Sequence, residues 1–311
     1  MSSAIFKSPL PYLALLLSHL IWGGNFVVAK ITLQEFPPSS LAFLRFGLAA
    51  LFLIPFFLTE TKKTRIHRRD LAPLVGIGVL MITLNISFFF AGITKTTAIN
   101  ASTLTLVIPM LSVLLSWILL KEKVYLINLL GIALGLSGAL IIIGLPEIIF
   151  GQLDSEILMG NVLILLAATS WVVGSILSRR MLKVYSSLSV TAFAFFIGAA
   201  TFLLPAVSEY LKNPLWPSQV TILGIVGLIY MTMLSSISGY FLFEWGLAKT
   251  SVDRANLFQY VEPAIAAILA ILILGETVNK YFMTGAVLIA AGLYLGTLGK
   301  EVYHHHKLHR V

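Results

Sequence analysis

The chain has 311 residues, of which 58% are hydrophobic and 11% are charged, and its formal net charge is +8. A soluble domain of this length could not bury so much apolar surface, so the composition excludes a water-soluble protein and indicates that a lipid bilayer surrounds the chain. There is no cysteine, which excludes disulfides, thiolate metal sites and thiol nucleophiles.

Ten apolar stretches are long enough to be transmembrane helices, since a span needs about 20 residues. In chain order they cover residues 11–31, 39–58, 71–91, 98–120, 125–144, 157–178, 188–207, 220–243, 255–274 and 281–299. Residues 1–7 are too few for a cleaved signal peptide, so we expect the first stretch to be retained as a helix. Short connections such as 121–124 predict that neighbouring helices run antiparallel.

Basic residues are distributed unevenly over the connections. The two termini and the connections expected on their side hold sixteen Lys and Arg, whereas the opposite connections hold four. The positive-inside rule therefore places both termini in the cytoplasm, as parts of a multi-pass protein of the plasma (inner) membrane. Because this topology accounts for the positive charge, we do not expect nucleic acid as a partner.

The chain contains an internal repeat, in which residues 92–138 align without a gap on residues 246–292. Equivalent positions are 154 residues apart, so that Pro109 corresponds to Pro263 and Glu122 to Glu276. Five predicted spans separate the copies, an odd number, so the copies cross the membrane in opposite directions. Such inverted repeats are typical of secondary transporters, which hold their substrate where the two copies meet.

A fainter match links the first spans of the two halves. Trp22 and Trp171 each lie eight residues before a basic residue, Lys30 and Arg179 respectively. Together the patterns predict an all-α membrane protein with ten transmembrane helices arranged as a 5+5 inverted repeat. The first half would be 1–144, the connecting loop 145–156, the second half 157–299 and the cytoplasmic tail 300–311.

Several motifs resemble those of EamA-type members of the drug/metabolite transporter superfamily. They are the run 22–26, the Pro38…Arg45 opening of the second span, Pro109…Glu122, and Glu262-Pro263…Glu276. The resemblance covers nearly the whole chain. It implies a ten-helix carrier that moves amino acids, other small metabolites or drugs, mostly outward. It also implies a central cavity lined mainly by spans one, three, four, six, eight and nine.

His19 and Glu262 are ionisable residues predicted deep in the membrane, each about 12 Å from the cytoplasmic side. Ionisable groups at this depth are costly and usually functional. The ordinary pKa of a histidine lies near neutrality, which suits His19 to a proton relay or a hydrogen bond to substrate, although it could simply bond a backbone carbonyl. Glu262 could bind a proton or a cationic substrate, or only satisfy backbone groups freed by Pro263. We hypothesise that the two approach each other, or share a water, and couple transport.

Aromatic and amide side chains at membrane depth are candidates for substrate binding, because they offer stacking faces and hydrogen bonds to an amphipathic metabolite or a cation. With His19, the predicted substrate-binding residues are Trp22, Asn85, Trp171, Tyr240, Gln259 and Tyr260.

Other polar or helix-breaking residues are predicted to be structural. Glu122 and Glu276 are equivalent under the repeat and are expected to cap neighbouring helices. Arg45 is expected to extend towards the outer interface, with contact to a substrate carboxylate as the alternative. Pro109 and Pro263 belong to the scaffold motifs. His304–His306 and His309 are expected in a solvated tail, and no metal or cofactor site is predicted.

The leading functional interpretation is export of small amphipathic metabolites, with amino acids favoured, by alternating access. The close alternative is a multidrug exporter of lipophilic cations. A membrane-embedded enzyme is disfavoured because the deep acidic residues do not cluster and no His-x-x-x-His or Gly-x-Ser-x-Gly spacing occurs. The expected partners are a small-molecule substrate and lipid, with the chain a monomer or a weak homo-oligomer.

Overall fold

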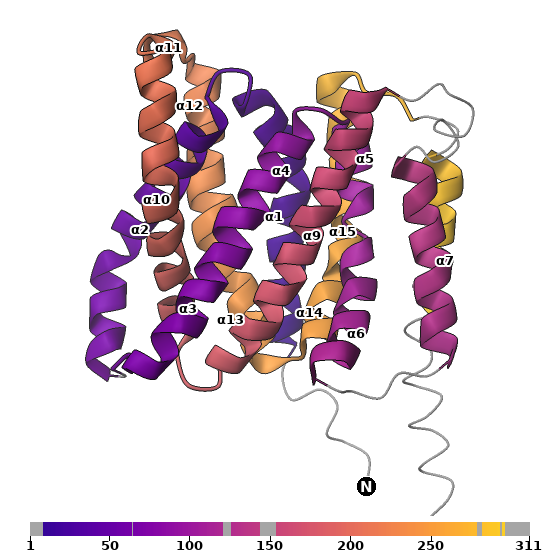
Figure 1. Cartoon of the computed structure of the whole chain (residues 1–311), viewed down its shortest axis with the longest axis horizontal. Coiled ribbons are helices and arrows are strands. Elements are labelled where there is room, and N and C mark those ends of the chain that lie inside the picture. The colour runs from indigo at the N-terminus through magenta and orange to yellow at the C-terminus, as the bar shows by residue number, and fades with distance from the viewer. Residues whose placement is uncertain are drawn as a thin grey trace, which may run out of the picture.

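The structure is a computed structural model that describes residues 9–63, 65–120, 126–143, 154–278, 282–292 and 294–295. All regular secondary structure in these ranges is helical (Figure 1). The first half contains α1 (Leu10–Thr32), α2 (Pro38–Lys63), η1 (Arg68–Asp70), α3 (Leu71–Ile77), η2 (Gly78–Leu84), α4 (Asn85–Ile93), α5 (Ala98–Leu104), α6 (Val107–Leu120) and α7 (Leu126–Ile143). The second contains α9 (Ser155–Met181), α10 (Ser187–Lys212), α11 (Trp216–Gln219), α12 (Ile222–Ile229), η3 (Tyr230–Tyr240), α13 (Phe241–Lys249), α14 (Val252–Asn256), η4 (Leu257–Tyr260), α15 (Val261–Leu269), η5 (Ala270–Leu274) and the helix Phe282–Gly292.

Eight helical segments among the described residues are long and apolar enough to cross a membrane. Two shorter apolar helices, Leu129–Ile142 and Phe282–Gly292, lie where the fifth and tenth spans were predicted. Apolar side chains face outward along the long helices, and Ile222, Leu204 and Leu272 are 81%, 77% and 76% exposed. Lipid therefore takes the place of water around this surface.

Several helices continue beyond the predicted ends of their spans: α2 runs to Lys63, where 58 was predicted, and α10 to Lys212, where 207 was predicted. The end of the eighth span has the largest consequence. The eighth span was expected to end at 243, with Glu244 in a cytoplasmic connection, but α13 remains helical to Lys249. The helix ends only at Thr250, whose backbone angles (φ −125°, ψ −149°) are not helical. As a result, the Glu244 side chain is buried, and its Oε2 accepts a hydrogen bond of 2.6 Å from the Ser178 hydroxyl.

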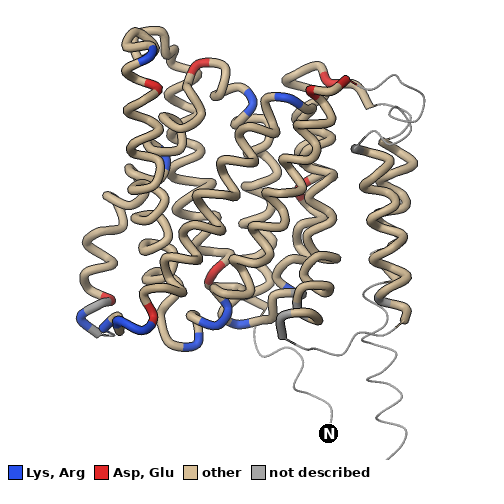
Figure 2. Tube along the Cα trace, in the orientation of Figure 1, with Lys and Arg blue, Asp and Glu red and all other residues tan. Residues whose placement is uncertain are grey.

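Charged residues gather at the two ends of the helices (Figure 2). Lys and Arg predominate at the end where α2 is connected to α3 and α9 to α10, whereas acidic residues are more frequent at the opposite end. The middle of the bundle is almost free of charge, as the hydrocarbon core of a bilayer requires.

Helices of the two halves pack against each other rather than forming separate bundles. α2 lies along α10, α4 along α9, and α1 along α13 and α15. α7 and the helix Phe282–Gly292 approach so closely that a Cβ on Gly138 would meet the Gly285 carbonyl. Small residues at such contacts allow helices to pack in lipid without a hydrophobic driving force.

Interruptions of the helices lie at corresponding places in the two halves. Pro109 and Pro263 cannot donate to the carbonyl four residues earlier, which belongs to Thr105 and to Gln259 respectively. The helix breaks between α5 and α6 at Thr105, and it tightens into the 3-10 segment η4 around Gln259. η2 and η3 are π-helical segments with a wider turn. The break at Thr105, the segment η3 and the segment η4 contribute residues to one cavity, and η2 ends directly before Asn85, which also lines it.

Candidate functional site

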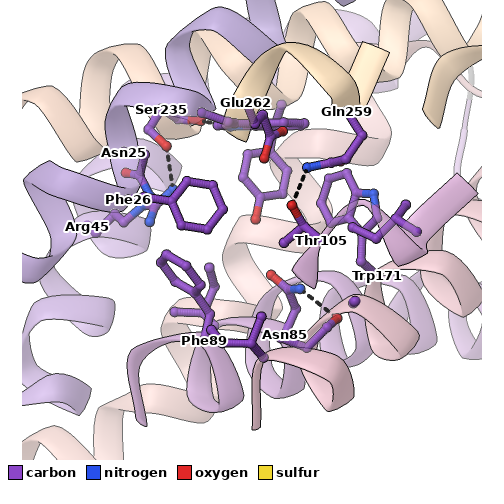
Figure 3. Close-up of a pocket in the computed structure, with 17 residues that line it drawn as sticks. Asn25, Phe26, Arg45, Asn85, Phe89, Thr105, Trp171, Ser235, Gln259 and Glu262 are labelled. Atoms are coloured by element: carbon purple, nitrogen blue, oxygen red, sulfur yellow. Dashed lines mark hydrogen bonds between the residues drawn. The ribbon is translucent and has the colours of Figure 1, made fainter. Parts of the chain in front are cut away.

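A cavity of about 90 Å³ lies between the two halves (Figure 3). This volume is sufficient for several water molecules or part of a small ligand. Its lining combines aromatic, amide, hydroxyl and charged side chains: Trp22, Asn25, Phe26, Arg45, Asn85, Ile86, Phe89, Thr105, Ile108, Ile164, Ala167, Ala168, Trp171, Ser235, Tyr240, Gln259 and Glu262. The predicted spans one, three, four, six, eight and nine all contribute, and α2 adds Arg45.

Aromatic rings that meet edge to face form one wall of the cavity. Trp22 meets Trp171 edge-on, with ring centroids 5.1 Å apart at 85°, and meets Tyr240 at 5.4 Å. The Trp22 indole is held in place because its Nε1 donates to the Ser235 carbonyl at 2.9 Å. Trp22 and Trp171, the two residues paired by the fainter sequence match, therefore come into contact at the cavity. The wall offers ring faces and edges to an apolar group.

A polar contact between equivalent residues crosses the cavity near the helix breaks. Gln259 Nε2 donates to Thr105 Oγ1 at 3.2 Å, and the two residues are 154 positions apart. Nearby, Asn85 Nδ2 donates to the Ala167 carbonyl at 2.9 Å, which orients its amide (Figure 3). These side chains leave unused hydrogen-bonding capacity on both amides.

Arg45 lies in the cavity wall and not at the membrane interface. Its residue is 1% exposed, so its guanidinium does not extend to the surface as expected from the sequence. Nε donates to Ser236 Oγ at 2.6 Å and Nη2 to Ser235 Oγ at 3.0 Å. Both serines belong to the π-helical segment η3, so the irregular helix positions the guanidinium.

His19 and Glu262 lie next to each other at the edge of the cavity. His19 Nδ1 donates to the Leu15 carbonyl at 2.7 Å, and Nε2 lies 4.0 Å from Glu262 Oε1. Both side chains are buried, and Nε2 has no hydrogen-bond partner in the described part of the chain. Because Nδ1 holds a proton for Leu15, a neutral His19 presents an acceptor nitrogen towards Glu262. Glu262 faces the cavity, whereas His19 lies behind it.

The other predicted site residues divide into three groups. Trp22, Asn85, Trp171, Tyr240 and Gln259 line the cavity, whereas His19 and Tyr260 do not. The Glu276 carboxylate accepts from the Ala98 and Ile99 backbone N–H groups, and Lys30 Nζ lies 3.0 Å from it. Glu122, the tail histidines and the loop 145–153 lie outside the described residues.

Three polar lining residues were missed from the sequence: Asn25, Thr105 and Ser235. The repeat itself contained a signal for Thr105, since Gln259 was a candidate and Thr105 is its equivalent. Asn25 is the amide that follows the Trp22-Gly-Gly run. Ser235 had no signal, because its orientation depends on the wide turn of η3.

This arrangement defines a multi-pass helical membrane protein with a cavity between its two halves. The model of the EamA-like transporter family matches residues 9–144 and, a second time, residues 158–298. The chain therefore belongs to the EamA-like transporter family.

Relatives that align along nearly their full length are named as transporters. The "Probable amino-acid metabolite efflux pump" of Salmonella typhimurium is 30% identical over 94% of this chain and 95% of its own. An "Uncharacterized transporter" of Archaeoglobus fulgidus is 29% identical over 92% of this chain and 96% of its own length. One solved crystal structure superposes with a TM-score of 0.66 at 19% identity, covering 93% of this chain and 96% of that chain, which establishes a shared fold.

Proposed function

We propose that the chain is a secondary active transporter that exports small amphipathic metabolites, foremost amino acids, by alternating access through the central cavity. The observation that carries this proposal is the cavity itself. It lies between the halves, is lined by aromatic, amide and charged side chains, and receives residues from both. Two relatives, from Salmonella typhimurium and Escherichia coli, are named as amino-acid metabolite efflux pumps, which favours this substrate class.

The proposed architecture has ten transmembrane helices in a 5+5 inverted repeat, with both termini in the cytoplasm of a plasma (inner) membrane protein. The proposed halves are 1–144 and 157–299, separated by the loop 145–156 and followed by the tail 300–311. The double match of the family model and the Thr105–Gln259 contact between equivalent residues support this division. The chain would work without a cofactor, as a monomer or a weak homo-oligomer.

In this mechanism the two halves rock around the bound substrate. A substrate that binds the inward-open and outward-open states differently shifts the balance between them, and its gradient or a coupled proton supplies direction. The pair His19–Glu262 is the proposed coupling site, because Glu262 faces the cavity and lies 4.0 Å from His19 Nε2. The proposed substrate contacts are Trp22, Asn85, Trp171, Tyr240 and Gln259, together with His19 and Tyr260 at the margin.

A second candidate is export of lipophilic cations. Glu262 is a carboxyl group in the cavity wall and the aromatic rings lie close by, a combination that suits a cation with apolar substituents. The presence of Arg45 in the same cavity opposes it, since a guanidinium repels cationic cargo.

Counterflow in proteoliposomes separates the two candidates. Liposomes are loaded with one unlabelled compound, and uptake of its radiolabelled form is followed, for a panel of amino acids and for tetraphenylphosphonium. The proposal predicts saturable counterflow of at least one class of amino acid. Counterflow of tetraphenylphosphonium alone, in protein shown to be folded, would replace it with the second candidate.

A further inference from the structure

Among the described residues, Arg45 is a charged side chain that is buried without a counter-ion. No carboxylate among the described residues lies within 4.0 Å of its guanidinium, although salt bridges of Lys30, Arg69 and Lys95 are found. The side chain is fully enclosed, and its Nη1 has no hydrogen-bond partner in the part of the chain that the structure describes. A buried charge without a counter-ion is costly, and in membrane proteins such groups usually mark a ligand path.

The guanidinium is fixed in position before any ligand binds. Ser236 and Ser235 hold Nε and Nη2, and the Phe46 ring lies 4.9 Å from Cζ. These contacts leave Nη1 as the free side of the guanidinium fork, and Arg45 lines the cavity beside Asn25 (Figure 3). A planar donor group held in this way suits a carboxylate, which it can bind through parallel charge-assisted hydrogen bonds.

The same cavity contains acceptors for an ammonium group. Asn25 Oδ1 is buried without a hydrogen-bond partner in the described chain, and the Glu262 carboxyl forms another part of the wall. A guanidinium and a carboxyl group in one small cavity match a zwitterion better than either a simple anion or a simple cation. The aromatic wall of Trp22, Trp171 and Tyr240 is then available to the side chain of the ligand.

We propose that Arg45, held by Ser235 and Ser236, is the carboxylate-binding subsite of the cavity, and that the substrate is a zwitterionic α-amino acid. This deepens the transport function proposed above and rests on it. Arg45 then determines specificity: it admits compounds with a free carboxylate and rejects the corresponding amines and amides.

Ligand binding to the purified full-length protein tests the proposal without requiring transport. Thermal unfolding is measured with amino acids, their α-amides, the corresponding decarboxylated amines, and the corresponding acids that lack the amino group. Wild-type protein should be stabilised by amino acids and not by their amides or amines. Arg45→Gln should weaken amino-acid binding by roughly thirtyfold or more, because it removes one partner of a buried charge pair. Arg45→Lys keeps the charge but loses the planar guanidinium, so it should bind amino acids more weakly than the wild type and more tightly than Arg45→Gln.

A matched control keeps the result interpretable. Arg69→Gln removes an equal charge from a side chain that is 83% exposed, and it should leave binding unchanged. If Arg45→Gln does not fold, the comparison of amino acids with their α-amides in wild-type protein still shows whether binding requires a free carboxylate.

Each outcome has a distinct meaning. If amino acids bind and Arg45→Gln binds them equally well, the carboxylate subsite is wrong while amino-acid transport stands. If only acids without an amino group bind, and Arg45→Gln loses them, the subsite stands and the amino-acid function fails. If amines or tetraphenylphosphonium bind and carboxylates do not, or if no carboxylate binds the folded wild-type protein, the subsite is overturned.

Discussion

At the scale of single residues, the neighbouring pair His19 and Glu262 is the part of the site that is suited to carry a proton. The Leu15 carbonyl fixes the His19 ring and leaves Nε2 directed at Glu262 Oε1, 4.0 Å away. This separation is too long for a direct hydrogen bond, but a bridging water or a small movement would connect the two groups. Because Glu262 faces the cavity, its protonation changes the charge beside the bound substrate.

Glu262→Gln should therefore abolish the pH dependence of transport. An amide cannot gain or lose the proton, so the rate of amino-acid counterflow should vary by less than about twofold between pH 5.5 and 8. The measurement is counterflow at a series of pH values, with Glu156→Gln as a control. Glu156 is an exposed carboxylate near one end of α9, with a side chain 73% exposed. A Glu262→Gln profile as steep as that of the wild type would contradict the coupling role.

At the scale of helices, α1 contacts α15 through a glycine. A Cβ on Gly23 would lie 2.8 Å from Ile265 Cβ and 3.1 Å from the Glu262 carbonyl, so a side chain there would push the two helices apart. Gly47, in the middle of α2, has open space where a Cβ would be placed. The two positions form a natural pair for comparison.

Gly23→Ala should destabilise the protein by about 1–3 kcal/mol, the usual cost of overpacking, and should disturb the position of Glu262. Gly47→Ala should be neutral or slightly stabilising, because alanine favours a helix over glycine and meets no neighbour. Thermal unfolding of both variants in the same detergent measures the difference. Equal melting temperatures for the two would show that α1 and α15 are not in close contact.

Helix ends on both faces are connected by corresponding contacts. Lys30 Nζ donates to the Thr96 carbonyl at 2.7 Å and forms an ion pair with Glu276. The Glu276 carboxylate caps α5, and Gly275, with φ 66°, forms the turn directly before Glu276. At the other end, Arg179 Nη2 donates to the Thr250 carbonyl at 2.7 Å. Thr96 and Thr250 are equivalent under the repeat, as are Lys30 and Arg179 by the fainter match. Both contacts are formed in this structure, and contacts of this kind can hold an end of the cavity closed.

Lys30→Ala should weaken closure at the end that contains Glu276. The chain has no native cysteine, so a single cysteine in place of Phe89 in the cavity can report access. Its labelling by a membrane-impermeant maleimide from that face should be several times faster in Lys30→Ala, since an ion pair and a helix-end contact are lost. Lys95→Ala, at a more exposed ion pair with Glu156, is the control and should change little. Unchanged labelling in both variants would exclude a gating role for Lys30.

The sequence predicted much of this architecture because its signals are periodic or duplicated. Span positions follow from apolar length. Trp22, Trp171 and Tyr260 were selected because they lie too deep to be interfacial residues, and of these Trp22 and Trp171 line the cavity whereas Tyr260 does not. The rotation of a helix about its axis is harder to predict: Arg45 was expected to extend towards the outer interface, whereas its side chain is buried in the cavity wall. Glu244 was placed in the connection after the eighth span, whereas it is buried in α13 and accepts a hydrogen bond from the Ser178 hydroxyl. Ser235 depends on a π-helical turn that leaves no pattern in the sequence.

At the scale of the whole molecule, equivalent residues of the two halves meet at the cavity. Trp22 contacts Trp171, and Gln259 contacts Thr105, and the proposed inverted repeat would have its axis near these two contacts. An axis in the membrane plane makes the two faces of the protein similar, and two similar closed states are what alternating access requires.

The predicted topology can be tested with reporters fused after Val311. A green fluorescent protein fused there should be fluorescent and alkaline phosphatase should be inactive, because the positive charge bias predicts that this end lies in the cytoplasm. Fusions to the connection at 213–215, between α10 and α11, should show the opposite behaviour. Active phosphatase at both positions would contradict the ten-span, inverted arrangement.

The most direct test of the account is whether the cavity opens to each face in turn. The single cysteine at position 89, in an otherwise unaltered chain, is labelled by impermeant maleimide from one face or the other, with and without a saturating amino acid that the protein exchanges. Alternating access predicts labelling from both faces. The ratio of the two labelling rates should change when the amino acid is added. Labelling confined to one face under every condition, in protein that binds the amino acid, would contradict alternating access through this cavity.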